Sequence, residues 1–180
     1  VERENTLIND LLELVKLDKA AAELNISVVN INELAEVILK TLRPIARKNN
    51  VEVTLISKRE ILAEVDKVKM SQIITNLVEN AIKYNREQGK VEVTLDADHQ
   101  FFTVQVEDTG IGIPAEAISQ IYERFYRVDK SHSRKIGGTG LGLAITRSAV
   151  LLHRGSIKVE SRENEGTTFT VKVPLTRSLT

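Results

Sequence analysis

The 180-residue sequence contains no cysteine, which excludes disulfide bonds and thiolate metal sites and fits a reducing compartment. It also lacks an excess of either charge, because 25 basic residues balance 25 acidic ones. No overall field therefore draws the chain to nucleic acid or to an anionic membrane, and any anion-binding site must be local. No apolar run approaches the roughly 20 residues that cross a bilayer, and the first residues show no signal-peptide pattern.

The first residues carry a long apolar stripe. In residues 2–21, leucine, isoleucine and valine recur at three- and four-residue steps with charged and polar residues between them, which predicts one amphipathic helix. No capping residue precedes the stripe at Val1. We interpret the helix as part of a dimerising bundle whose other half precedes this polypeptide, and it predicts a homodimer contact. The alternative is a helix that packs on its own domain.

The remainder mixes helices with hairpin strands, and its apolar content of 42% for the whole chain is sufficient for the core of one ordinary domain. Alternating apolar residues predict strands at 26–31, 51–56, 91–95, 101–106, 157–160 and 167–173. Helical patterns cover about 66–84, 114–122 and 142–153. Because adjacent strands form hairpins, we expect a two-layer α/β sandwich with a mixed, mostly antiparallel sheet and helices on one face.

A further helix should follow the first of these strands. Asn32 is its predicted N-cap, and Val37 and Ile45 are expected on its buried face with Leu34, Ile38 and Leu42. Pro44 predicts a bend or an early end near Arg43, because proline lacks the N–H group that a helix interior requires.

The helix at 66–84 carries a polar stripe opposite its apolar face. At 100° per residue, Asn76, Asn80 and Lys83 cluster within roughly 60° of one another. An asparagine oxygen is a hard, neutral ligand that suits Mg2+, and a lysine one turn away can balance phosphate charge. The alternative is an ordinary solvated helix face.

A carboxylate and a glycine turn follow the strand at 101–106. The residues are Asp108-Thr109-Gly110-Ile111-Gly112. A carboxylate here can accept a hydrogen bond from the exocyclic amine of adenine. The same glycines match a dinucleotide-binding fingerprint weakly, but a carboxylate at that turn would repel pyrophosphate. An ordinary turn is the other alternative.

A second glycine run, residues 137–142, leads directly into a helix. Glycines allow close backbone approach, and a helix N-terminus offers free N–H groups to an anion. The basic segment before it, residues 123–137, lacks periodicity and is typical of a functional loop. Phe125 and Tyr126 in that segment could stack on nucleic acid, but the neutral overall charge disfavours such a partner. Together with the two features above, this run predicts an ATP site.

Taken in order, these segments resemble the ATP-binding domain of bacterial sensor histidine kinases, in the superfamily shared with gyrase, Hsp90 and MutL. Residues 76–84 resemble the N box, 108–112 the G1 box, 123–127 the F box and 138–142 the G2 box, and 165–169 resemble the closing motif. The resemblance implies a Bergerat ATP-binding fold in an ATP-binding kinase domain at residues 24–176. Residues 1–23 resemble the end of the dimerisation and phosphotransfer helix.

The resemblance also implies roles for individual residues. Asp108 would read the adenine amine, Asn80 would hold Mg2+, and Lys83 and Arg127 would contact phosphate. The remaining nucleotide-binding residues would be Tyr84, Gly110, Gly112, Gly138, Gly140, Leu141, Gly142 and Thr168. ATP-hydrolysing relatives carry a glutamate at the position of Asn76, and an amide cannot act as that general base.

The implied function is transfer of the ATP γ-phosphoryl group to a histidine in two-component signalling. The acceptor would lie on the dimerisation domain, which is absent from this polypeptide, since His99, His132 and His153 stand in no helical phosphoacceptor motif. The expected partners are that domain and a response regulator, and the expected location is the cytoplasmic part of a membrane sensor. The alternatives are a regulatory nucleotide-binding module without transfer activity and an anti-sigma-type serine kinase.

Overall fold

A five-stranded mixed sheet forms one layer of the protein. The computed structural model describes residues 24–123 and 142–177. The strand order is β2 (Glu52–Ser57), β4 (Lys90–Ala97), β5 (Phe101–Asp108), β7 (Gly166–Pro174) and β6 (Ser156–Arg162). Only the β2–β4 pair of this sheet is parallel. The predicted mixed, mostly antiparallel sheet is therefore confirmed.

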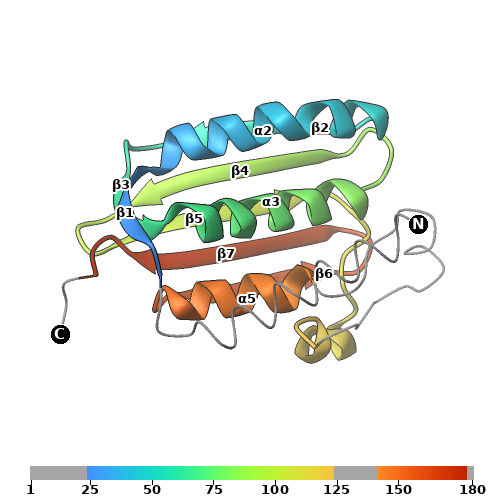
Figure 1. Cartoon of the computed structure of the whole chain (residues 1–180). Helices are drawn as coiled ribbons and strands as arrows, with labels where there is room; N and C mark the ends of the chain where they lie inside the picture. The colour runs from blue at the N-terminus through green and yellow to red at the C-terminus, as the bar shows by residue number, and fades with distance from the viewer. Residues whose placement is uncertain (1–23, 124–141, 178–180) are drawn as a thin grey trace, which may run out of the picture.

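Three helices lie side by side across one face of this sheet, as Figure 1 shows: α2 (Ile31–Lys48), α3 (Lys67–Lys83) and α5 (Gly142–Leu152). The central strands turn alternate apolar residues toward them, and Phe102, Val104 and Val106 of β5 are all buried. These two layers confirm the predicted α/β sandwich. The predicted short helix at 114–122 is a 3-10 helix, η1 (Ala115–Gln120). The amphipathic helix expected at 2–21 lies outside the described residues.

A second, two-stranded sheet was only half predicted. The strand expected at 26–31 is β1 (Ile26–Asn30), and it pairs antiparallel with β3 (Leu62–Asp66). Sequence reasoning missed β3, which is five residues long and runs directly into α3. Asp66 ends the strand and caps the helix, because its side chain accepts a hydrogen bond from the Lys69 N–H at 3.0 Å.

The predicted cap of α2 was wrong. Asn30, and not Asn32, is the N-cap, and its Oδ1 accepts a hydrogen bond from the N–H of Glu33 at 3.0 Å. The Asn32 side chain instead accepts from the N–H of Ile61 at 2.7 Å and donates to the carbonyl of Arg59 at 2.8 Å. Asparagine is a preferred N-cap residue, so the sequence allows either position. The contacts of Asn32 with Arg59 and Ile61 leave Asn30 as the cap.

The predicted early end of α2 was also wrong. The helix continues through Pro44 to Lys48, and Ala46 beyond the proline is only 1% exposed. Burial of the apolar face on both sides of Pro44 offsets the hydrogen bond that proline cannot make. Val37 and Ile45, expected on the buried face, are 64% and 43% exposed.

Candidate functional site

Asp108 ends the central strand β5, and within the described residues one of its two carboxylate oxygens is hydrogen-bonded. Its Oδ1 accepts hydrogen bonds from the backbone N–H groups of Gly110 at 2.8 Å and Thr167 at 3.2 Å. Its Oδ2 makes no hydrogen bond within the described residues. Burial raises the pKa of Asp108 to about 6, although the two N–H groups act in the opposite direction. The site therefore holds a partly desolvated acceptor that pairs with no cation among the described residues.

The glycine turn after Asp108 is packed against the C-terminal end of α3. The N–H of Ile111 donates to the carbonyl of Tyr84, the C-cap of α3, at 3.1 Å. A Cβ atom on Gly110 would lie 2.4 Å from that same carbonyl oxygen, so only glycine fits there. Gly112 has a φ of +71°, and a Cβ on it would lie 2.0 Å from the carbonyl oxygen of Arg162. Tyr84, Asp108 and both glycines are thus brought together.

The turn is also held by residues that sequence reasoning missed. The Arg86 guanidinium donates to the carbonyl of Gly110 at 3.0 Å and also to that of Asn164, in the β6–β7 turn. The Ser161 hydroxyl accepts from the N–H of Ile113 at 2.7 Å and lies 2.7 Å from the Thr167 hydroxyl. These contacts join segments far apart in sequence, and no periodic pattern in the sequence predicts them.

The asparagine stripe of α3 faces the start of α5. The Asn76 Nδ2 lies 3.4 Å from the carbonyl oxygen of Gly142 and 3.3 Å from the Thr146 hydroxyl. Asn80, one turn later, is half-buried, and its amide makes no hydrogen bond within the described residues. Lys83 forms an ion pair with Glu79, with Nζ 3.9 Å from Oε2. The predicted stripe therefore lies where the second glycine run enters its helix.

Thr168 is not brought to this site. It pairs with Glu107 in the β5–β7 register, and its hydroxyl donates to that carboxylate at 3.4 Å. Since successive side chains of a strand point to opposite faces, Thr168 lies across the sheet from Asp108, and Thr167 occupies the near side. The predicted residues Arg127, Gly138, Gly140 and Leu141 lie outside the described residues.

The donor set fits a metal that arrives with a phosphate ligand. Residues 24–123 and 142–177 contain no group of three His, Cys, Asp or Glu side chains that could hold a metal ion. Asn80 offers a neutral amide oxygen that no protein group in these ranges occupies. Mg2+ is commonly bound through few protein oxygens together with water and nucleotide phosphates, so one amide beside a triphosphate suits it.

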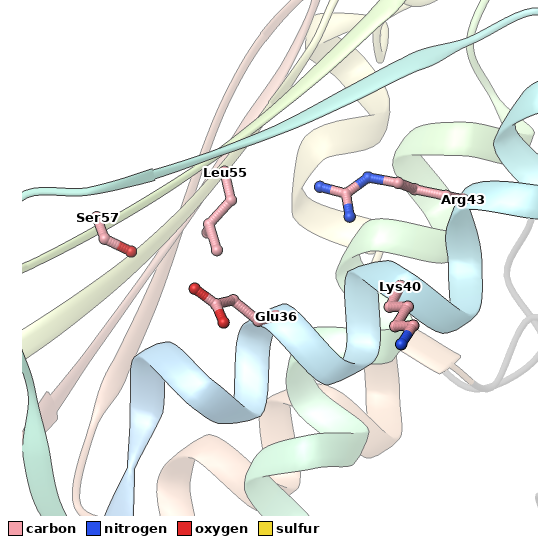
Figure 2. Close-up of a pocket in the computed structure, with 5 residues that line it drawn as sticks. All are labelled: Glu36, Lys40, Arg43, Leu55 and Ser57. Carbon is pink, nitrogen blue, oxygen red and sulfur yellow. The ribbon is translucent and has the colours of Figure 1, made fainter.

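The open pocket in Figure 2 lies elsewhere, between α2 and the edge strand β2. It is lined by Glu36, Lys40, Arg43, Leu55 and Ser57, and the charged ends of Glu36 and Arg43 point into the space between the two elements. None of the predicted site residues lines it.

The described helices include none that is long and apolar enough to cross a membrane.

Comparison with known families and curated proteins gives a consistent result. The model of the family described as histidine kinase-, DNA gyrase B-, and HSP90-like ATPase matches residues 65–177. The sensor protein kinase WalK of Staphylococcus epidermidis is 39% identical over 175 residues, which cover 96% of this chain and 28% of that protein. WalK of Staphylococcus aureus is 37% identical over 175 residues, with 96% of this chain and 42% of the relative covered.

Solved structures agree with this similarity. The catalytic domain of histidine kinase ThkA is 31% identical with a TM-score of 0.75, and the match covers 85% of this chain and 97% of that one. Full-length ShkA in complex with AMPPNP gives 28% identity and a TM-score of 0.83, with 96% and 36% covered. ThkA in complex with the response regulator protein TrrA gives 27% identity and a TM-score of 0.74, with 96% and 49% covered.

Proposed function

The chain belongs to the family of histidine kinase-, DNA gyrase B- and HSP90-like ATPases, and we propose that it is the ATP-binding catalytic domain of a sensor histidine kinase. It spans 28% of the length of the S. epidermidis relative, so the activity proposed is that of a longer protein of which this chain resembles one part. The acceptor histidine is proposed to lie on the dimerisation domain of that longer protein.

The observation that carries the proposal is the Asp108 carboxylate, with Oδ1 fixed by two backbone N–H groups and Oδ2 without a hydrogen bond within the described residues. An oxygen of this kind accepts a hydrogen bond from the exocyclic amine of adenine, whereas guanine presents a carbonyl oxygen at the corresponding ring position and would be repelled. The half-buried carboxylate gains from such a donor, because it has lost hydration and no described residue places a cation against it. The site therefore favours ATP over GTP.

The phosphates extend from this adenine contact along α3. Asn80 is the proposed Mg2+ ligand, and Lys83 and Arg127 are the proposed phosphate cations. Gly138, Gly140, Leu141 and Gly142 contribute backbone N–H groups ahead of α5. Tyr84, Gly110 and Gly112 shape the adenine end, and Thr167 replaces Thr168 there because its N–H holds the Asp108 carboxylate.

The proposed reaction is transfer rather than hydrolysis. A histidine nitrogen of the dimerisation domain attacks the γ-phosphorus, an N–P bond forms, the bond to the bridging oxygen breaks, and ADP leaves. Asn76 cannot deprotonate water, so hydrolysis is slow. His153 is not the acceptor, because it is 1% exposed and both ring nitrogens are hydrogen-bonded, to the Asp66 N–H at 3.1 Å and the Ala149 carbonyl at 2.8 Å.

The proposed partners follow from the same role. They are the dimerisation domain that carries the histidine, a second copy of the chain through residues 1–23, and a response regulator, the class of protein bound in the ThkA complex. We place the chain on the cytoplasmic side of a membrane-anchored sensor, where ATP is available.

Phosphotransfer in trans tests the proposal. The chain is mixed with γ-labelled ATP, Mg2+ and a separately produced histidine-bearing dimerisation domain, and the label on each protein is followed. We expect acid-labile label on that domain, lost when its histidine is replaced and when Asn80→Ala is used. Acid-stable label on a serine would support an anti-sigma-type kinase. ATP binding without transfer to any partner would support the regulatory module.

A further inference from the structure

A buried hydroxyl on α5 contacts the asparagine stripe of α3. Thr146 is 0% exposed, and its Oγ1 donates to the carbonyl of Gly142, one turn earlier in α5, at 2.8 Å. The same oxygen lies 3.3 Å from the Nδ2 of Asn76, which in turn lies 3.4 Å from the Gly142 carbonyl oxygen. Three groups from two helices therefore meet at the point where the second glycine run becomes a helix.

The hydrogen-bonding capacities of these groups fix the orientation of the Asn76 amide. A carbonyl oxygen only accepts, and the single hydrogen of the Thr146 hydroxyl is already donated to Gly142. Both α5 atoms can therefore only accept a hydrogen bond from Asn76, and within the described residues its NH2 end is the group that donates to them. Its carbonyl oxygen Oδ1 must then point away from α5, and it makes no hydrogen bond within the described residues.

We propose that Thr146 is a positioning residue that turns the Asn76 oxygen toward the metal and phosphates held beside Asn80. Asn76 and Asn80 stand one turn apart, so their side chains are neighbours on the same helix face. The Asn76 oxygen is a neutral acceptor suited to a water of the Mg2+ shell. A flipped amide would present NH2 to that water and would repel it. This inference rests on the proposed ATP site.

The test uses Thr146→Val, which keeps the side-chain shape, and Thr146→Ser, which restores the hydroxyl. Titration with AMPPNP is done with Mg2+ and with EDTA. We expect the valine variant to lose affinity about three- to tenfold with Mg2+, the size of one hydrogen bond's net effect, and to match wild type in EDTA. The serine variant should match wild type in both. Equal losses in the two conditions, or no loss, would overturn the inference.

An NMR measurement without nucleotide gives an independent answer. The side-chain NH2 resonances of Asn76, assigned by their loss in Asn76→Asp, should be slow to exchange with water in wild type and faster in Thr146→Val, where the 3.4 Å contact with the Gly142 carbonyl remains. If the valine variant does not fold, the wild-type spectrum decides, because Asn76 NH2 protons that exchange as fast as those of Asn164, an exposed residue whose side chain makes no hydrogen bond within the described residues, would overturn the inference. Wild type that binds no AMPPNP at all would overturn the ATP site and this inference together; binding that the valine change leaves intact would overturn the inference alone.

Discussion

The backbone N–H of Thr167 donates to Oδ1 of Asp108 at 3.2 Å, across the pairing of β5 with β7. This contact and the 2.8 Å bond from the Gly110 N–H fix the carboxylate from two sides. Neither donor is a cation, so burial still raises the pKa of Asp108 to about 6. The fold therefore keeps a half-buried carboxylate that is less stable as an anion than in water, and the proposed adenine contact explains its presence.

Asp108→Asn should stabilise the protein while it abolishes adenine recognition. The folded carboxyl holds its proton up to about pH 6, against 3.8 in the unfolded chain, so the fold loses stability as pH rises through that window. At pH 7 the neutral amide should raise the free energy of unfolding by about 1–3 kcal/mol, after a discount for solvent screening. Its oxygen can still accept from Gly110 and Thr167, but its NH2 would repel the adenine amine.

The control for this variant is Asp98→Asn, at the other end of β5. The N–H groups of Phe101 and Gln100 lower the pKa of that exposed carboxyl, so its neutralisation should not stabilise the fold or affect nucleotide binding. Urea unfolding and AMPPNP titration check both variants. An Asp108→Asn protein that binds AMPPNP as wild type does would remove Asp108 from the adenine site.

The buried His153 should make the protein acid-sensitive. Burial lowers the pKa of His153 below 6.5, although its bond to Ala149 and the nearby Asp66 act in the opposite direction. The unfolded chain therefore takes up this proton first, and the free energy of unfolding should fall as pH drops below about 6.5. Protonation of Nε2 also removes the acceptor used by the Asp66 N–H. The charged groups around this ring are Asp66, Lys69 and Arg177.

His153→Gln separates this effect from that of Asp108, whose protonation has the opposite sign. Glutamine keeps an acceptor without titrating, so the stability difference between wild type and variant should shrink as pH falls from 7.5 to 5. Urea unfolding at several pH values measures it. A difference that is constant over this range would show that the histidine does not titrate with unfolding.

Asn80→Ala should abolish the strengthening of ATP binding by Mg2+. The change removes the amide oxygen proposed to bind the metal directly, and the half-buried position of Asn80 predicts little loss of stability. AMPPNP titration with and without Mg2+ checks this, with Asn49→Ala at the exposed end of α2 as the matched control. Retained Mg2+ dependence in Asn80→Ala would remove Asn80 from the metal site.

Lys83→Met should weaken triphosphate binding without weakening adenosine binding. Its ion pair with Glu79 spans 3.9 Å between side chains about one-third exposed, so its loss should change stability by less than about 1 kcal/mol. In wild type, this weak ion pair leaves the Lys83 ammonium available to a phosphate group. Glu79→Gln breaks the same ion pair and should leave ATP affinity unchanged or raise it. Calorimetry with AMPPNP and adenosine distinguishes the two variants, and equal losses for both ligands would contradict the phosphate role of Lys83.

The helical part of the site follows from sequence because helix geometry is local. The 3.6-residue period places Asn76, Asn80 and Lys83 on one stripe before any tertiary contact is known. The glycine turn after Asp108 is similar, since Gly110 and Gly112 stand where a Cβ would collide with backbone. The helix that carries the stripe and the sheet that carries Asp108 are therefore confirmed, while the nucleotide-binding roles of these residues stay predictions.

The remaining features depend on contacts between distant segments. Arg86 reaches Asn164 across 78 residues, and no local pattern predicts this. Thr167 and Thr168 are adjacent residues of the same type, so the sequence does not distinguish them. The pairing of β7 with β5 decides which one faces Asp108. The choice of Asn30 over Asn32 as the cap of α2 depends likewise on a distant contact, because the N–H of Ile61 donates to the Asn32 side chain.

Adenine and Mg2+ recognition are tested together by calorimetric titration of the chain with AMPPNP and with the matching GTP analogue, each with and without Mg2+. We expect binding that is selective for adenine and strengthened by Mg2+, because Asp108 is proposed to accept from the base and Asn80 to hold the metal. Equal binding of both nucleotides would contradict the role of Asp108, and no binding of either would contradict the ATP site itself.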